Sequence, residues 1–190
     1  MLKRRNSEIG FTLTDSNKLN RNKGFTLIEL LIVIAILGIL AVVVLVIMNP
    51  GERQAQARDT GRISSVTQIG RSLQAYYSTK TSYPDVANWA NDLVVSSELT
   101  TFPSGIAYSY NSVTPCSTYV QPAAAPTYCY NEDQDSSNGA VIFSKAESTT
   151  YRSKCTAPDE AYFVFSTIDA HGGIICSNGD PAPGTLTYQP

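Results

Sequence analysis

The chain contains an uncharged apolar stretch that is long enough to cross a membrane, and this stretch begins close behind a basic residue. Lys23 precedes Gly24-Phe25-Thr26-Leu27-Ile28-Glu29, and no charge follows Glu29 until Glu52. As a helix, residues 25–48 would measure roughly 36 Å, whereas the hydrocarbon core of a bilayer measures roughly 30 Å. A core helix of a globular protein has a polar face and this segment has none, so residues 25–48 are predicted to form a transmembrane helix.

Glu29 is out of place in such a segment, because an ionisable side chain at the centre of a membrane helix costs roughly 2.5–3.5 kcal/mol on insertion scales. Two interpretations stay open. In the first, Glu29 lies near the membrane interface and its carboxylate reaches water. In the second, the carboxylate pairs with a cation. Lys23 lies outside the apolar stretch, but a cut between Gly24 and Phe25 would create an α-amine for the same Glu29 or for that of a neighbouring subunit.

The run from Gly24 to Leu31 resembles the cleavage motif of type IV prepilins and type II secretion pseudopilins. The resemblance implies that a membrane prepilin peptidase cuts after Gly24 and then methylates the new N-terminal residue, Phe25. It also implies that Glu29 guides methylation and filament assembly. The partners it implies are this peptidase, other pilin or pseudopilin subunits, and an assembly platform with its ATPase.

Residues 1–24 then form a leader rather than part of the fold. The leader carries six basic residues against Glu8 and Asp15, a net charge of +4, which favours a cytoplasmic N-terminus and an extracytoplasmic head in a single-pass inner-membrane protein. A translation start near Leu19 would leave a six-residue leader and is an alternative. The whole chain carries −2, so the part from Phe25 onward carries −6, and its bulk charge gives no support for nucleic-acid binding.

Asn49-Pro50-Gly51 marks the exit from the membrane, where Pro50 either kinks the helix or starts a second helical segment. Apolar residues then recur at steps of three and four, which predicts an amphipathic helix over residues 52–78 with its stripe packed in a core. The stripe is Ile63, Val66, Ile69 or Gly70, Leu73, and Tyr76 or Tyr77. Arg58, Arg62 and Arg71 are expected to be solvated or to form salt bridges between subunits.

The remainder of the exported part, residues 49–190, has the pattern of a small head. Pro84 ends the amphipathic helix, and Asp85 is a candidate N-cap for a short helix over residues 85–98. Five short segments have strand character: 106–110, 127–130, 141–144, 162–167 and 173–176. The predicted fold class is therefore α+β, with a long N-terminal helix, half in the membrane and half amphipathic, packed on a small antiparallel sheet.

All four cysteines lie in the part predicted to be exported: Cys116, Cys129, Cys155 and Cys176. An even number outside the cytoplasm indicates two disulfides, for which three connectivities are open. Sequential pairing, Cys116 with Cys129 and Cys155 with Cys176, closes the shortest loops and is the one we expect. Each bond would stabilise the head by roughly 3 kcal/mol in the chain-entropy account.

The sequence argues against an enzyme and gives no cofactor. The one histidine, His171, is followed by two glycines as in a surface turn, and there is no phosphate-binding Gly-Lys-Ser/Thr motif. Glu132–Gly139 clusters oxygen-bearing side chains in a turn, and the major pseudopilins that the chain resembles bind calcium. Its spacing departs from that of a calcium loop, so no metal is expected and calcium stays an alternative.

These observations favour a structural subunit that polymerises into a type IV pilus-like filament or a type II secretion pseudopilus after processing. The two assemblies share this architecture, and the sequence does not separate them. The alternative is a membrane-anchored extracytoplasmic binding module that never polymerises.

Overall fold

The computed structural model describes residues 24–109, 114–116, 127–133, 139–184 and 186–190. They divide into two compact units that separate between Val46 and Ile47. Most of helix α1 (Leu27–Met48) belongs to the first unit, and the second unit is an α+β head built around helix α2 (Pro50–Lys80).

Helix α1 is apolar all round, and none of its residues is buried. A capping box starts it: the Glu29 backbone N–H donates to the Thr26 hydroxyl oxygen at 3.2 Å, and the Thr26 backbone N–H donates to the Glu29 carboxylate at 2.8 Å. The 22 residues rise over about 33 Å, so the helix is long and apolar enough to cross a membrane.

Helix α2 begins directly at Pro50, which settles the role of this proline as the first residue of a second helical segment. Asn49 precedes it in the left-handed conformation that asparagine tolerates, and its side-chain oxygen accepts from the Glu52 N–H at 3.4 Å. The helix ends at Lys80, where Thr81 takes a left-handed conformation and donates its N–H to the Tyr77 carbonyl oxygen at 2.8 Å. The helix therefore has an identifiable stop signal before Pro84.

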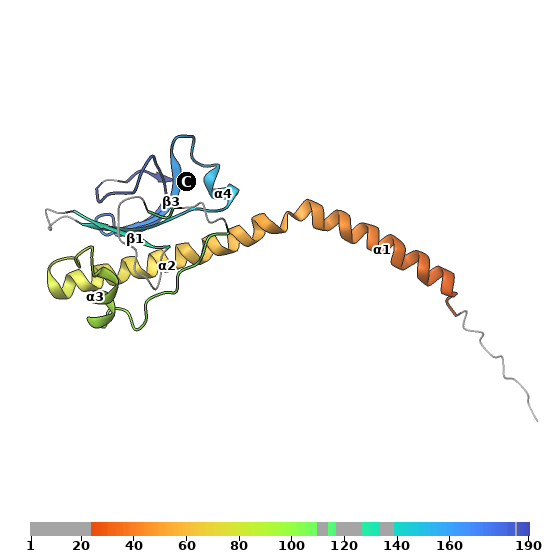
Figure 1. The fold of residues 1–190 in the computed structure, drawn as a ribbon, viewed down its shortest axis with the longest axis horizontal. Coiled ribbons are helices and arrows are strands. Elements are labelled where there is room, and N and C mark those ends of the chain that lie inside the picture. The colour runs from red at the N-terminus through yellow and green to blue at the C-terminus, as the bar shows by residue number, and fades with distance from the viewer. Residues whose placement is uncertain (1–23, 110–113, 117–126, 134–138, 185) are drawn as a thin grey trace, which may run out of the picture. The chain divides into compact units, whose positions relative to one another are not determined.

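Five strands form one antiparallel sheet in which each strand pairs with the next along the chain. They are β1 (Cys129–Glu132), β2 (Ala140–Lys145), β3 (Glu160–Ser166), β4 (His171–Ser177) and β5 (Tyr188–Gln189). Two short helices complete the head, α3 (Trp89–Val95) before the sheet and α4 (Thr149–Arg152) between β2 and β3. Figure 1 shows α2 running along one face of the sheet. This architecture confirms the predicted α+β class.

The main core lies between α2 and the sheet, and the predicted apolar stripe of α2 forms one side of it. Val66, Ile69 and Leu73 are at most 1% exposed and cluster with Ile142 and Phe165. Because successive residues of a strand point to opposite faces, a second apolar cluster forms on the far face of the sheet. Its members are Cys116, Cys129, Val141, Phe143, Tyr162, Val164 and Ile175.

Gly70 allows α2 to approach the sheet closely, because a Cβ atom at this position would lie 2.2 Å from Cδ1 of the buried Phe165 ring. Gly70→Ala should therefore destabilise the head by about 1–3 kcal/mol, although alanine favours helices by about 1 kcal/mol over glycine. The measurement is the midpoint of denaturant unfolding of the full chain in detergent.

Gly61→Ala is the matched control on the same helix. A Cβ there would meet only the tip of the Ile106 side chain, Cδ1, at 2.5 Å, and a side-chain tip can rotate away. This variant should stay within about 1 kcal/mol of the wild type. A Gly70→Ala variant as stable as the Gly61→Ala variant would contradict the close-approach explanation.

Two predictions about the head's elements need correction, and one strand was not predicted. The prediction of a strand over residues 106–110 is wrong for the described residues 106–109, because their backbone groups bond side chains instead of a neighbouring strand. The Ile106 and Ala107 carbonyls accept from Arg62, and the Ser109 N–H donates to Glu147. The short helix spans only Trp89–Val95, because Asp85 accepts from the Ala87 N–H in a preceding turn rather than capping it. Strand β5 was not predicted, since two residues are too short for an alternating pattern.

Candidate functional site

The predicted processing segment lies just before α1. Phe25 is 83% exposed, and a Cβ atom built on Gly24 would meet nothing within 4 Å. Gly24 and Phe25 are therefore both exposed, as a cleavage site requires. Cleavage after Gly24, methylation of Phe25 and the assembly role of Glu29 stay predictions.

Glu29 has a hydrogen-bonding partner, Thr26, that was not predicted. Its carboxylate accepts from the backbone N–H and the hydroxyl of Thr26, at 2.8 and 2.7 Å. The spacing Thr-x-x-Glu before an apolar run is the signature of a capping box and was readable in the sequence. Both Thr26 donors are neutral, so they orient the carboxylate in the first turn of α1 without neutralising its charge.

A second group of interacting residues lies inside the head, where α2 meets the end of β2. The Arg62 side chain is fully buried and donates to the Asp59 carboxylate at 2.7 Å and to the Glu147 carboxylate at 2.9 Å. Its guanidinium also donates to the Ile106 and Ala107 carbonyl oxygens, at 3.1 and 3.0 Å, and lies 3.9 Å from the Tyr108 ring centroid. Arginine's planar fork suits this set of partners, which a lysine ammonium could not reproduce.

The carboxylates of this cluster are equally well bonded. Asp59 accepts from the backbone N–H groups of Glu147 and Ser148, the latter at 2.7 Å, besides Arg62. Glu147 accepts from Arg58 at 2.8 Å and from the Ser109 N–H at 2.9 Å. Two carboxylates thus face two guanidinium groups, and the buried charges balance.

The pKa of Glu147 reflects this environment. Burial alone would raise the pKa, but hydrogen bonds from Arg58, the Ser109 N–H and Arg62 outweigh burial and lower it from 4.5 to about 2. The carboxylate is therefore ionised in the folded head at all but strongly acidic pH.

The expectation that Arg62 is solvated or bridges subunits is wrong. It is 0% exposed, because Asp59 lies one helical turn before it and Glu147 reaches it from a part of the chain 85 residues away. Arg58 pairs with the same Glu147 inside the chain and its side chain is 26% exposed. Arg71 does lie at the surface, as expected. We name Arg58, Asp59, Arg62 and Glu147 the ion cluster.

Both disulfides are present in the structure. Cys116 is bonded to Cys129 of β1, and Cys155 to Cys176 of β4. The first bond holds the described residues 114–116 against the far face of the sheet, where Cys116 is 6% exposed. The second links the segment after α4 to β4.

The loop Glu132–Gly139, the alternative calcium site, is described only at Glu132, Asp133 and Gly139, and residues 134–138 lie outside the described part. Among the residues that the structure does describe, no three His, Cys, Asp or Glu side chains gather as metal ligands. Burial, together with the negative charge of Asp85, raises the pKa of Glu132.

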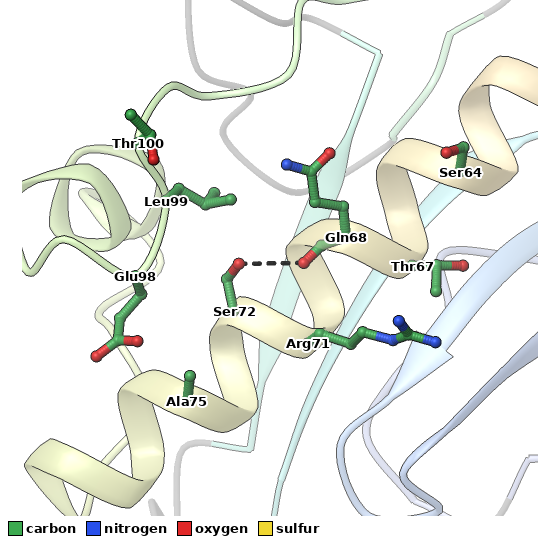
Figure 2. A pocket seen from close by; sticks show the side chains of 9 residues that line it. All are labelled: Ser64, Thr67, Gln68, Arg71, Ser72, Ala75, Glu98, Leu99 and Thr100. Carbon is green, nitrogen blue, oxygen red and sulfur yellow. Dashed lines mark hydrogen bonds between the residues drawn. The ribbon is translucent and has the colours of Figure 1, made fainter.

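A polar groove follows the outer side of α2, next to the segment after α3. Figure 2 shows Arg71 and Glu98 extending in different directions from its two sides, and the Ser72 hydroxyl donates to the Gln68 carbonyl oxygen at 3.1 Å. The nine lining residues are Ser64, Thr67, Gln68, Arg71, Ser72, Ala75, Glu98, Leu99 and Thr100. None of these nine residues is a histidine that could activate a hydroxyl or a cysteine that could act as a nucleophile. The groove therefore gives no support for a catalytic site.

Comparison with known proteins is informative for the N-terminal region. Residues 19–45 match the family described as the prokaryotic N-terminal methylation motif. A stretch of 68 residues is 40% identical to the type IV major pilin protein PilA of Myxococcus xanthus. That stretch covers 36% of this chain and only 30% of the Myxococcus protein. No solved structure matches the chain significantly.

The match and the architecture agree: an exposed apolar helix with a prepilin motif at its start is followed by an α+β head. The N-terminal region is thus similar to that of type IV pilins and pseudopilins.

Proposed function

We propose that this chain is a structural subunit that polymerises into a type IV pilus-like filament after processing. A prepilin peptidase cuts between Gly24 and Phe25 and methylates the amine of Phe25. Before assembly, the processed subunit resides in the inner membrane as a single-pass protein with its N-terminus on the cytoplasmic side. An assembly platform with its ATPase then adds it to the filament. The name of the Myxococcus relative favours a pilus over a secretion pseudopilus.

The observation that carries this proposal is the exposure of α1. All 22 residues of the helix lie outside any core of the chain, and its large apolar side chains are about half exposed or more. So much apolar surface needs a bilayer, other copies of the helix, or each in turn. Small residues at Ala35, Gly38 and Ala41 would let helices of neighbouring subunits approach closely.

The ion cluster supports the proposal from the side of the head. It connects α2 with the end of β2 through bonds that are shielded from water, and buried pairs of this kind are screened little by salt. The sheet is thereby fixed to α2, the helical segment that follows the membrane exit, as a filament subunit under mechanical load requires.

Processing gives the direct test of the first step. Co-expression of the full chain with a prepilin peptidase should remove residues 1–24 and leave an N-methylated Phe25, which intact-mass analysis detects as one shorter species carrying one added methyl group. A full-length product, or a cut at another bond, would contradict the proposal.

Substitutions at Gly24 separate the peptidase from the fold. Because a Cβ at Gly24 meets nothing within 4 Å, neither Gly24→Ala nor Gly24→Leu should disturb the chain itself. We expect Gly24→Ala to be cut more readily than Gly24→Leu, since the family resemblance implies a small residue at this subsite. Equal cleavage of both variants would show that the peptidase does not select for side-chain size at position 24.

A further inference from the structure

Beyond α1, the described residues expose three large apolar side chains, and two of these lie together. Val94 is 36% exposed and Val95 is 73% exposed at the end of α3, while the third, Ile168, lies between β3 and β4. Asp92 and Glu98 flank the two valines and are partly exposed. We name Val94 and Val95, with these two carboxylates, the α3 knob.

A groove of complementary character lies elsewhere on the same head, between α2 and the last two strands. Its apolar lining includes Ile63, Tyr151, Phe163, Ile174 and Tyr188, and its volume of about 390 Å³ falls within the range of sites that hold small ligands. Lys154 and His171 also line it and are exposed. The Lys154 ammonium donates to the Pro190 carbonyl oxygen, and an ammonium group has three donors in all. We name this feature the β4–β5 groove.

The knob and the groove lie at opposite edges of the sheet. Trp89 of α3 stacks on Tyr130 of β1, with ring centroids 5.2 Å apart, and β1 is one edge strand. The groove is lined from β4 and β5, at the other edge. One head can therefore bind the groove of a second head through its knob while its own groove holds the knob of a third head.

We propose that the α3 knob of one subunit inserts into the β4–β5 groove of a second copy of this chain. The valines fill the apolar lining, and the Glu98 carboxylate meets the Lys154 ammonium at its margin. The two surfaces differ, so the contact is heterologous, and such contacts build open helical arrays whenever the rotation does not close a ring. The inference rests on the proposed filament and supplies it with a contact between heads.

The apolar half of the contact is tested with full-length chains and a complete assembly system. Val95→Asp places a charge in the groove and should lower sheared filament recovery, normalised to subunit in the membrane fraction, by roughly tenfold or more. Ile168→Asp is the matched control, an apolar-to-acidic change on the same head outside the knob, and should stay within about twofold of wild type. Protease resistance of both variants checks that the head is folded.

The polar half is tested by exchanging charges. Glu98→Lys and Lys154→Glu should each lower recovery by about threefold, and the double variant should return to within about twofold of wild type, because the pair is then restored with reversed signs. Restoration would not occur if either residue acted only within its own head.

Each other outcome has a definite meaning. Val95→Asp filaments at wild-type yield, equal losses in Val95→Asp and Ile168→Asp, or a double variant no better than the single ones would overturn the knob-and-groove contact and leave the proposed function standing. Absence of wild-type filaments in the complete system would instead overturn the proposed function, and the contact with it.

Discussion

Glu29→Gln is expected to reduce filament recovery by about 100-fold while the subunit still inserts in the membrane and folds its head. Cleavage after Gly24 would create a cation in the segment, the Phe25 amine. Pairing of this amine with the Glu29 of a neighbouring subunit would neutralise two charges that are each costly in hydrocarbon. Glutamine keeps the shape of the side chain but leaves the amine without a counter-charge. Shear-fraction recovery is measured beside a membrane-fraction control.

The capping box makes glutamine the informative substitution. Glu29 also accepts hydrogen bonds from Thr26, so Glu29→Ala would remove a helix cap and a charge together. Glutamine can close a capping box as glutamate does, and Glu29→Gln therefore removes the charge alone. Glu29→Ala should assemble poorly as well.

Thr26→Val is the reciprocal control. It removes the hydroxyl that accepts from the Glu29 N–H, at a cost of about 1 kcal/mol to the start of α1, and keeps the carboxylate. Recovery of filaments should stay close to that of wild type. Equal filament recovery from wild type, Glu29→Gln and Glu29→Ala would contradict the charge-pairing explanation. A loss in Thr26→Val as large as in Glu29→Gln would show that assembly depends on the helix cap rather than on the charge.

Periodic patterns in the sequence predicted much of the fold, because helices and strands repeat over short distances. The α2 stripe of Val66, Ile69 and Leu73 is buried as predicted, and four of the predicted strand segments lie in β1 to β4 within a few residues at each end. The membrane helix and the prepilin motif were likewise predicted from one short stretch of sequence, and the comparisons with known proteins match the same stretch.

The ion cluster could not be predicted in the same way. Whether an arginine on a helix is solvated depends on what reaches it from elsewhere in the chain, and Glu147, just beyond the end of β2, lies 85 residues after Arg62. The same cluster explains the wrong strand at 106–110. Tyr108 alternates with its neighbours as in a strand, but the carbonyls beside it accept from Arg62 rather than from a neighbouring strand. The capping box of Thr26 and Glu29, by contrast, joins residues three positions apart and could have been predicted from the sequence.

Arg62→Met should destabilise the head by about 3–5 kcal/mol, the second large effect that the structure predicts. Without Arg62, Asp59 and Glu147 each lose a guanidinium group that donates to them. The carbonyls of Ile106 and Ala107 lose a buried donor as well. Denaturant unfolding of the full chain in detergent gives the free energy of unfolding. Arg71→Met, the same substitution at an exposed position of the same helix, should change it by less than about 0.5 kcal/mol.

Acid gives an independent measure of the same cluster. The pKa of Glu147 is lowered in the folded head to about 2 from an ordinary value of 4.5, so the stabilisation is complete above about pH 5 and is lost as pH falls through the folded pKa. Across that window the wild-type head should lose on the order of 3 kcal/mol through this group. Glu147→Gln cannot titrate, so its stability should fall less steeply between pH 5 and about pH 2. Parallel acid profiles for Glu147→Gln and wild type, or equal costs for Arg62→Met and Arg71→Met, would mean that the buried charges do not stabilise the contact between α2 and the sheet.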